Sequence, residues 1–175
     1  MNKQSIAEIY INNDQIREKF NQMLAALTPQ QTSALPDGEK WTVAQIVEHV
    51  SIVEDGMTRI CSKLLNEAQA AGDGSVNISD NFVEKGTEIA QIKIEAPERV
   101  IPSGGKTIAE SKAKLEENRA KLHELRPLFE SADCNENKFP HPFFGDLSAG
   151  EWLKLIGGHE VRHMKQIQNV LGKIG

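Results

Sequence analysis

Two histidines four residues apart, His159 and His163, are the residues of this chain whose type and spacing most directly suggest chemistry. They lie near the end of the sequence, where apolar residues recur at helical spacing, and both fall near the centre of the apolar stripe. Residues four apart on a helix have Cβ atoms about 5–6 Å apart, so two imidazoles at this spacing can bind one metal ion. The stripe consists of Trp152, Leu155, Ile156, Ile167 and Val170.

A third ligand decides between a metal site and the alternative, which is a pair of unrelated structural histidines in the core. His49 is the candidate, because it lies about 60° from the centre of the apolar stripe of an earlier helix and can lean inward. Three neutral imidazoles would leave coordination positions open for water and substrate, which is typical of catalytic rather than structural sites. Nitrogen ligands suit zinc, nickel, copper or iron, and we expect zinc or nickel.

Four further polar residues are candidates for a place near these histidines. Gln166 falls on the inward stripe and could hold a ligand or a metal-bound water in place. His141 precedes a proline in a loop near one end of the predicted fold, and it is either a turn residue or part of a pocket. Glu48 and Glu160 adjoin two of the histidines, and either could be a general base or support a ligand, but one residue's step turns a side chain about 100° around the helix. We therefore expect solvated or capping roles for both glutamates.

Four segments with apolar residues at helical spacing are predicted to position these side chains. They make an all-α four-helix bundle the natural fold, and the cores of such bundles commonly hold metal sites built from facing helices. Capping boxes predict the starts of the second, third and fourth helices, at Thr42, Thr107 and Ser148. The predicted helices cover about residues 5–27, 43–64, 108–126, where Pro127 kinks or ends the helix, and 149–171, with Gly172 after the last residue.

The second and third helices are joined by a long connection, residues 69–106, which is polar and glycine-rich and lacks a long helical period. A structureless stretch of this length is unusual in a compact domain, so we expect it to pack across the bundle with short turns. An extended piece is expected at residues 90–94, and a rigid loop at residues 139–146. The polar face of the first helix, which includes Arg17, is expected to be solvated.

The composition restricts the class of protein. The 175 residues, of which 39% are hydrophobic, predict one domain over residues 1–175 with a core large enough to fold without metal or disulfides. The net charge of −5 comes without a basic cluster, which disfavours nucleic acid as a partner. No signal peptide or membrane span is indicated, so we expect a cytoplasmic protein without a membrane partner. Cys61 and Cys134 lack metal-site or redox-motif spacing and are expected to be free thiols.

Three stretches of the sequence resemble the DinB-like superfamily, which includes the YfiT-type metal-dependent hydrolases. They are WTVAQIVEHV at residues 41–50, HPFFGDLSAGEW at residues 141–152, and the pair His159-x-x-x-His163. The resemblance implies a divalent metal inside a four-helix bundle, held by a histidine on the second helix and a His-x-x-x-His pair on the last. These positions match His49, His159 and His163. Members include thiol transferases that use bacillithiol or mycothiol-like cosubstrates, a mycothiol-dependent isomerase, and proteins without a known activity.

The expected function is that of a divalent-metal-dependent enzyme acting on a small molecule, either a hydrolase or a thiol S-transferase. For thiol transfer the sulfur would come from a low-molecular-weight thiol, because the chain's own cysteines are not near the ligand motifs. The alternative is a non-catalytic metal- or ligand-binding helical module that acts through a partner. We also expect a homodimer, and we expect metal occupancy to fall as the pH drops through about 6.5, because imidazole binds metal as the neutral base.

Overall fold

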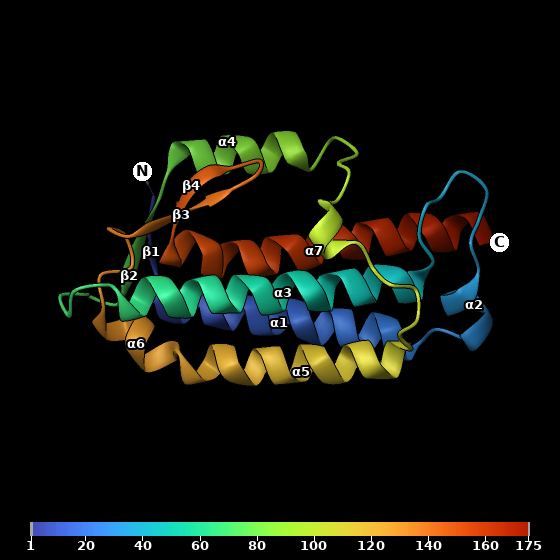
Figure 1. Cartoon of the computed structure of the whole chain (residues 1–175), viewed down its shortest axis with the longest axis horizontal. Helices are drawn as coiled ribbons and strands as arrows, with labels where there is room; N and C mark the ends of the chain where they lie inside the picture. The colour runs from blue at the N-terminus through green and yellow to red at the C-terminus, as the bar shows by residue number, and fades with distance from the viewer. Residues whose placement is uncertain (1, 175) are drawn as a thin grey trace.

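Four long helices lie along the long axis of the molecule in a computed structural model that describes residues 2–174. Helix α7 packs against α1 and α3, and α3 also packs against α5. The hydroxyl of Tyr10 in α1 donates to the Leu122 carbonyl of α5 at 2.6 Å, so α1 and α5 are also in contact. The predicted all-α four-helix bundle is therefore confirmed (Figure 1). The four helices are α1 (Ile6–Ala25), α3 (Val43–Asn66), α5 (Ile108–Glu124) and α7 (Ala149–Ile174).

The three predicted capping boxes fix the starts of α3, α5 and α7. At α3 the Thr42 hydroxyl accepts from the Gln45 amide at 3.2 Å, and the Gln45 side chain accepts from the Thr42 amide at 2.9 Å. Thr107 forms the same reciprocal pair at the start of α5, and Ser148 does so at the start of α7. These bonds satisfy amides that have no partner inside the helix. The first residue of each of these helices therefore agrees with the sequence prediction.

The core divides into two apolar clusters that follow one another along the bundle axis. A layer of buried polar side chains separates them, at the middle of all four helices. One cluster is centred on Ile6, Tyr10, Leu65, Phe129, Trp152 and Leu153, and the other on Phe20, Val47, Val50, Leu115, Ile167 and Val170. The predicted inward stripe of the last helix is buried throughout. Among the described residues, no helix combines the length and the apolar character that crossing a membrane requires.

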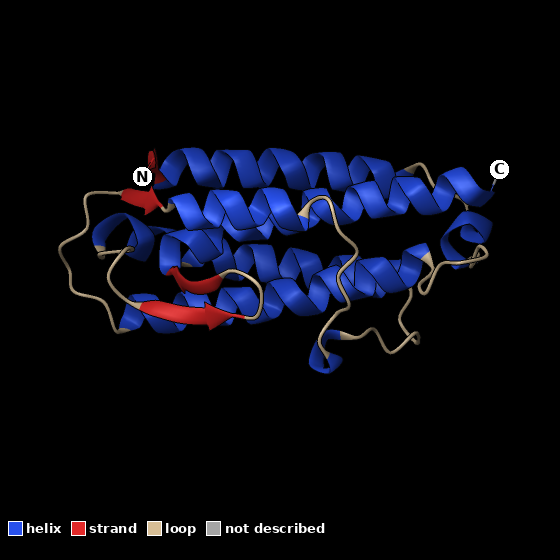
Figure 2. Ribbon diagram, turned by 90° about the horizontal axis from the view of Figure 1, so that it is seen from above, coloured by secondary structure: helices blue, strands red, loops and turns tan. Residues whose placement is uncertain are grey.

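The connection between α3 and α5 contains more regular structure than the sequence indicates. Strand β2 (Ser75–Ile78) pairs antiparallel with β1 (Asn2–Ser5), and β2 is followed by α4 (Asp80–Ile89) and the 3-10 helix η1 (Glu98–Val100). Residues 90–94 form a turn and irregular chain, so the predicted extended piece is wrong. Helix α4 shows no long apolar period because it buries a single side chain, Phe82. Figure 2 shows the irregular chain that follows α4 crossing the bundle.

The segment before α7 is a β-hairpin, not the loop that the sequence predicts. Strands β3 (Lys138–His141) and β4 (Gly145–Ser148) pair antiparallel, with Pro140 opposite Asp146. Prolines in and after the first strand hide the strand pattern, because proline is unusual within strands. Gly145 has a φ of 76°, a conformation that glycine adopts readily. Figure 1 shows the hairpin next to α4, where the Phe82 and Phe144 rings lie 5.3 Å apart.

Two other helix ends test the sequence predictions. Helix α5 ends at Glu124 and the chain turns into a short helix, α6 (Arg126–Ser131), so the predicted break near Pro127 is confirmed. Gly172 does not end the last helix, because α7 continues to Ile174. Leu171 and Ile174 pack against the second apolar cluster, which keeps the last turn helical through the glycine. A short helix, α2 (Pro29–Ser33), follows α1.

Candidate metal site

The structure brings His49 of α3 together with His159 and His163 of α7. One ring nitrogen from each histidine lies within 4.8 Å of the others. The Nε2 atoms of His159 and His163 are 3.0 Å apart. The ring centroid of His49 lies 5.3 Å from that of His159 and 4.8 Å from that of His163. Among residues 2–174, these are the three His, Cys, Asp or Glu side chains whose geometry could hold a metal ion.

Hydrogen bonds on the outer side of two rings determine which nitrogen faces the cluster. His49 Nδ1 lies 2.7 Å from the Val100 carbonyl oxygen. A carbonyl only accepts, so His49 carries its proton on Nδ1 and keeps a lone pair on Nε2. His163 Nδ1 lies 2.7 Å from the Gln166 amide oxygen, which selects the same tautomer. Both rings therefore direct an Nε2 lone pair at the cluster, as metal-binding histidines do.

Burial keeps these imidazoles neutral. It lowers the pKa of His163 to about 3, with the neighbouring His49 contributing in the same direction. Burial also places the pKa of His159 well below its ordinary value, and the two other histidines add to this effect. The pKa of His49 is lowered by burial as well, although the bond to Val100 opposes the shift. Three neutral nitrogen donors at one point fit a divalent transition metal without the release of a proton.

The fold and this geometry agree with the comparison to known proteins. The profile of the DinB superfamily matches residues 13–167. This chain belongs to the DinB superfamily. It is similar to a protein of Bacillus subtilis (strain 168) named "Uncharacterized protein YuaE", with 28% identity over 172 residues that cover 94% of this chain and 97% of the relative. It is also similar to the protein in "Crystal structure of TT2238, a four-helix bundle protein", with 25% identity, a TM-score of 0.63, and coverage of 94% and 99% of the two chains.

Glu48 of this DinB-superfamily chain is buried, so the expected solvated role is wrong. Its side chain is 4% exposed and accepts from the Ser103 amide at 2.9 Å, the Ser103 hydroxyl at 2.6 Å and the Gly104 amide at 3.1 Å. Burial alone would raise the pKa of Glu48, but these hydrogen bonds outweigh it, and the pKa lies below the ordinary value. Glu48 is therefore an ionised anchor for the connection that passes the site.

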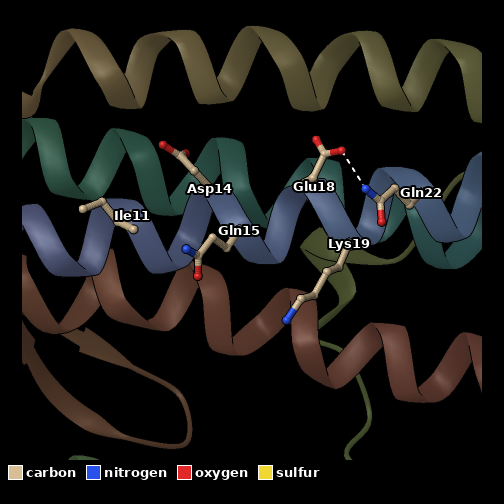
Figure 3. Close-up of a pocket in the computed structure, with 6 residues that line it drawn as sticks. All are labelled: Ile11, Asp14, Gln15, Glu18, Lys19 and Gln22. Carbon is tan, nitrogen blue, oxygen red and sulfur yellow. Dashed lines mark hydrogen bonds between the residues drawn. The ribbon is translucent and has the colours of Figure 1, made fainter.

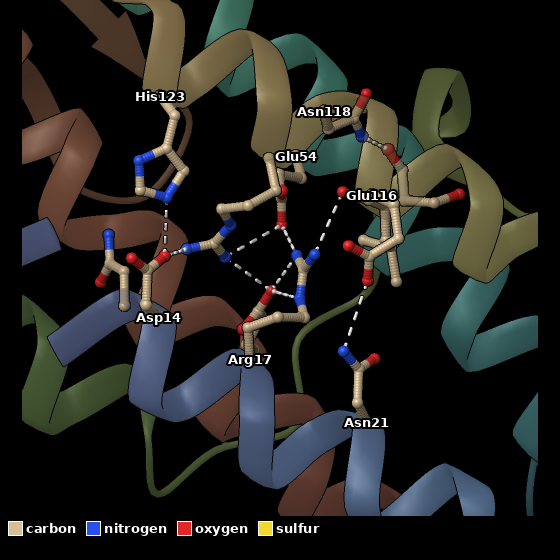
Figure 4. Close-up of polar contacts among 12 residues, drawn as sticks. Asp14, Arg17, Asn21, Glu54, Glu116, Asn118 and His123 are labelled. Atoms are coloured by element: carbon tan, nitrogen blue, oxygen red, sulfur yellow. Dashed lines mark hydrogen bonds and ion pairs between the residues drawn. The ribbon is translucent and has the colours of Figure 1, made fainter. Parts of the chain in front are cut away.

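Glu160 is buried as well, within an ion network at the middle of the bundle that includes Arg17 and Glu54 (Figure 4). Arg17 of α1 donates through Nε to Glu160 Oε1 at 2.8 Å, and its Nη2 donates to both Glu160 and Glu54. Arg119 of α5 lies 3.3 Å from the same Glu160 oxygen. Burial raises the pKa of Glu160 to about 7, although Arg17 opposes the shift. Arg17 is 5% exposed, so the expected solvated position of this arginine is also wrong.

The solvated positions expected for Glu160 and Arg17 are wrong because a helix of the bundle faces more than one other helix. The histidines point toward α3, and a step of one residue along α7 brings Glu160 against α1 and α5 instead of solvent. A charged residue at the same level of three other helices is the signal that sequence reasoning did not use. Through Arg17 and Arg119 this network links α7 to the other three helices of the bundle, one residue after His159.

The two residues predicted to be near the site have different positions. Gln166 contacts His163, as described above. His141 is the last residue of β3, next to the turn of the hairpin and outside the three-histidine cluster, and its Nδ1 accepts from the Phe143 amide at 3.1 Å and the Phe144 amide at 3.3 Å. Burial lowers the pKa of His141 to about 4. These bonds give His141 the turn role, and a pocket role stays a prediction.

A shallow groove lies on the outer face of α1, and it is separate from the histidines (Figure 3). All of its lining residues come from a single helix, so no second element brings polar groups toward a ligand. The lining residues are Ile11, Asp14, Gln15, Glu18, Lys19 and Gln22. The groove therefore does not compete with the histidine cluster as a candidate site.

Proposed function

We propose that this DinB-superfamily protein is a divalent-metal-dependent enzyme that acts on a small molecule, with His49, His159 and His163 as the metal ligands. The observation that carries the proposal is the convergence of three neutral imidazoles, two of which have Nδ1 occupied by an outer acceptor. Such a ligand set leaves positions for water and substrate. Nitrogen donors favour zinc or nickel among the ions that a cell supplies.

His49, His159 and His163 would hold the ion, which when bound would lower the pKa of a water or thiol and so supply a nucleophile at neutral pH. Other residues of the chain hold the ligand rings in the orientation that binds the ion. Val100 and Gln166 hold two of the imidazole rings, and the ion network at Glu160 fixes the rotation of α7. Water as the nucleophile would make the protein a hydrolase, and a thiol would make it an S-transferase.

The cysteines of the chain favour an external thiol if sulfur is transferred. Cys61 and Cys134 are buried in the apolar cluster at the far side of the polar layer. Burial raises the pKa of both thiols, that of Cys134 to about 12. Because the thiolate is the nucleophilic form, neither cysteine is suited to attack a substrate. A low-molecular-weight thiol is therefore the cosubstrate that this proposal includes.

The test of the ligand set compares histidine variants for metal binding. Metal-free wild type is titrated with zinc and with nickel, and bound metal is measured by elemental analysis after desalting. His49→Ala and His163→Ala should each lose the metal while keeping their far-UV circular dichroism. His123→Ala is the matched control, because His123 lies outside the cluster and contacts Asp14 at 3.0 Å. Equal metal binding by His49→Ala and wild type would remove the proposed ligand set.

The test of catalysis uses the metal-loaded protein. It is assayed with thiol and electrophile pairs and with simple esters and amides, and His163→Ala serves as the control. Turnover that requires both the metal and His163 supports an enzyme and identifies the nucleophile. Tight metal binding with no metal-dependent turnover in any of these assays would favour the non-catalytic binding module. Sedimentation of the same sample tests the expected homodimer against the monomer mass of 19.4 kDa.

A further inference from the structure

The connection between α3 and α5 is fastened to the bundle beside the histidine cluster. The Val100 carbonyl contacts His49, and Glu48 binds the chain three residues further on. On the other side Arg162 donates to the Ile89 carbonyl, and to a second carbonyl three residues later at 3.0 Å. Glu48 immediately precedes His49, and Arg162 immediately precedes His163. Two of the three histidines thus follow a residue that holds the same segment.

Glu48 makes the more complete of these attachments. Its Oε1 accepts two bonds from Ser103 and its Oε2 accepts one from Gly104, and the side chain is almost fully buried. Gly104 has a φ of 77°, a conformation that glycine adopts readily, and its N–H donates to the carboxylate. A Cβ at this position would stand 3.0 Å from the Gln45 side chain. The turn at residues 103–104 is therefore shaped around the Glu48 carboxylate.

The position of this turn determines where the Val100 carbonyl lies, because only three peptide units separate Val100 from Ser103. That carbonyl is the acceptor that holds the proton of His49 on Nδ1. Without it, neutral histidine in water prefers the proton on Nε2, the nitrogen that faces the cluster. We propose that Glu48 is a positioning residue that, through Ser103 and the Val100 carbonyl, holds His49 in the tautomer with a free Nε2. The effect of this tautomer on metal binding rests on the proposed function, whereas the tautomer itself can be measured without metal.

The chain offers a matched control for Glu48. Glu151 is 3% exposed and accepts from the Ser79 amide at 3.0 Å, the Ser79 hydroxyl at 2.6 Å and the Ser148 amide at 3.1 Å. The pattern of three donors to two carboxylate oxygens is the same as that at Glu48. Glu151 fastens the other end of the same connection, two helical turns before His159. If releasing the connection from the bundle were enough to change His49, replacing either glutamate would do so. If Glu48 sets the His49 tautomer, only its replacement changes that tautomer.

The experiment compares Glu48→Gln with Glu151→Gln. In metal-free protein, nitrogen-15 spectra of the histidine rings distinguish protonated from unprotonated ring nitrogens. Wild type and Glu151→Gln should show His49 protonated on Nδ1, while Glu48→Gln should show a mixture that includes protonation on Nε2. Zinc affinity, measured by competition with a chelator, should fall at least about tenfold in Glu48→Gln and stay within about twofold of wild type in Glu151→Gln.

Ser103→Ala removes one of the three bonds and should move the tautomer in the same direction by a smaller amount, which keeps the test available if Glu48→Gln folds poorly. The proposal is overturned if His49 remains protonated on Nδ1 in both Glu48→Gln and Ser103→Ala. It is also overturned if Glu151→Gln shifts the tautomer as much as Glu48→Gln does. If wild type binds no zinc, the proposed function fails, and the tautomer comparison still decides the role of Glu48.

Discussion

Removal of Arg17 should destabilise the protein far more than the loss of a surface charge does. Arg17 donates to Glu160, Glu54 and the Leu115 carbonyl, and it is buried among them. In Arg17→Met two carboxylates remain in the polar layer with Arg119 as their nearest cation, 3.3 Å from Glu160 and 3.9 Å from Glu54. Breaking a buried ion pair by removing one partner costs about 3–5 kcal/mol, and we expect a loss of this size at about pH 8.

The loss should depend on pH with a defined sign. Arg17 opposes the rise of the Glu160 pKa, so its removal raises that pKa further. A raised carboxyl pKa means that the folded state binds a proton more readily than the unfolded state, so lowering the pH stabilises the variant relative to wild type. Because the pKa of Glu160 in wild type is already about 7, the recovery between pH 8 and pH 5 is at most about 1.4 kcal/mol, the free energy that corresponds to one pH unit. The difference from wild type should therefore be smaller at about pH 5 than at about pH 8.

The assay is urea unfolding followed by far-UV circular dichroism, at both pH values, with metal-free protein. Arg59→Met is the control, because Arg59 makes an ion pair with Asp55 at 2.6 Å but is 77% exposed. Exposed pairs contribute about 0–1 kcal/mol, so this variant should remain close to wild type. If Arg17→Met loses less than about 1 kcal/mol at pH 8, or loses the same amount at both pH values, the buried ion network does not behave as described.

Three further predictions concern packing, protonation and thiol reactivity. Gly157→Ala should lose about 1–3 kcal/mol in urea unfolding, because its Cβ would meet the Asn13 side chain at 2.2 Å, whereas Gly158→Ala, with open space around it, should be neutral or stabilising. The stabilities of metal-free wild type and His163→Ala should diverge between about pH 7 and pH 5, with wild type losing about 2 kcal/mol more, because the unfolded histidine takes a proton that the buried ring, with a pKa of about 3, does not. Cys61 should resist alkylation in the folded protein and react after denaturation, since burial raises the pKa of its thiol; rapid labelling of the native form would contradict its position in the core.

The four helices and the meeting of the three histidines were predictable because their signals are local. Helical periodicity and a cap such as Thr42 depend on residues within a few positions of one another. The spacing of His159 and His163 on one face follows from helix geometry alone. His49 joined them because its helix is a neighbour of α7 in the bundle.

The remainder depends on residues that are distant in the sequence. Strand β2 is recognisable only through its partner β1, and the hairpin before α7 contains prolines that obscure its pattern. The burial of Arg17 requires Glu54 and Glu160 from two other helices at the same level. A single helical wheel assigns each of these charges to a solvated face, since it cannot show that a helix is covered on two sides. The attachment of Glu48 to residues 103–104 was hidden for the same reason.

The pairing of β1 with β2 has a consequence for the order in which the protein folds. Asn2 pairs with Ile78 and Ser5 with Ser75, so the two strands come from distant parts of the chain. Helices form from neighbouring residues within about a microsecond, whereas a long loop must lose entropy before its distant ends gain any contact. Strand β2 also packs against α7, the last helix in the sequence. We therefore expect the helical signal to develop during refolding before β1 pairs with β2.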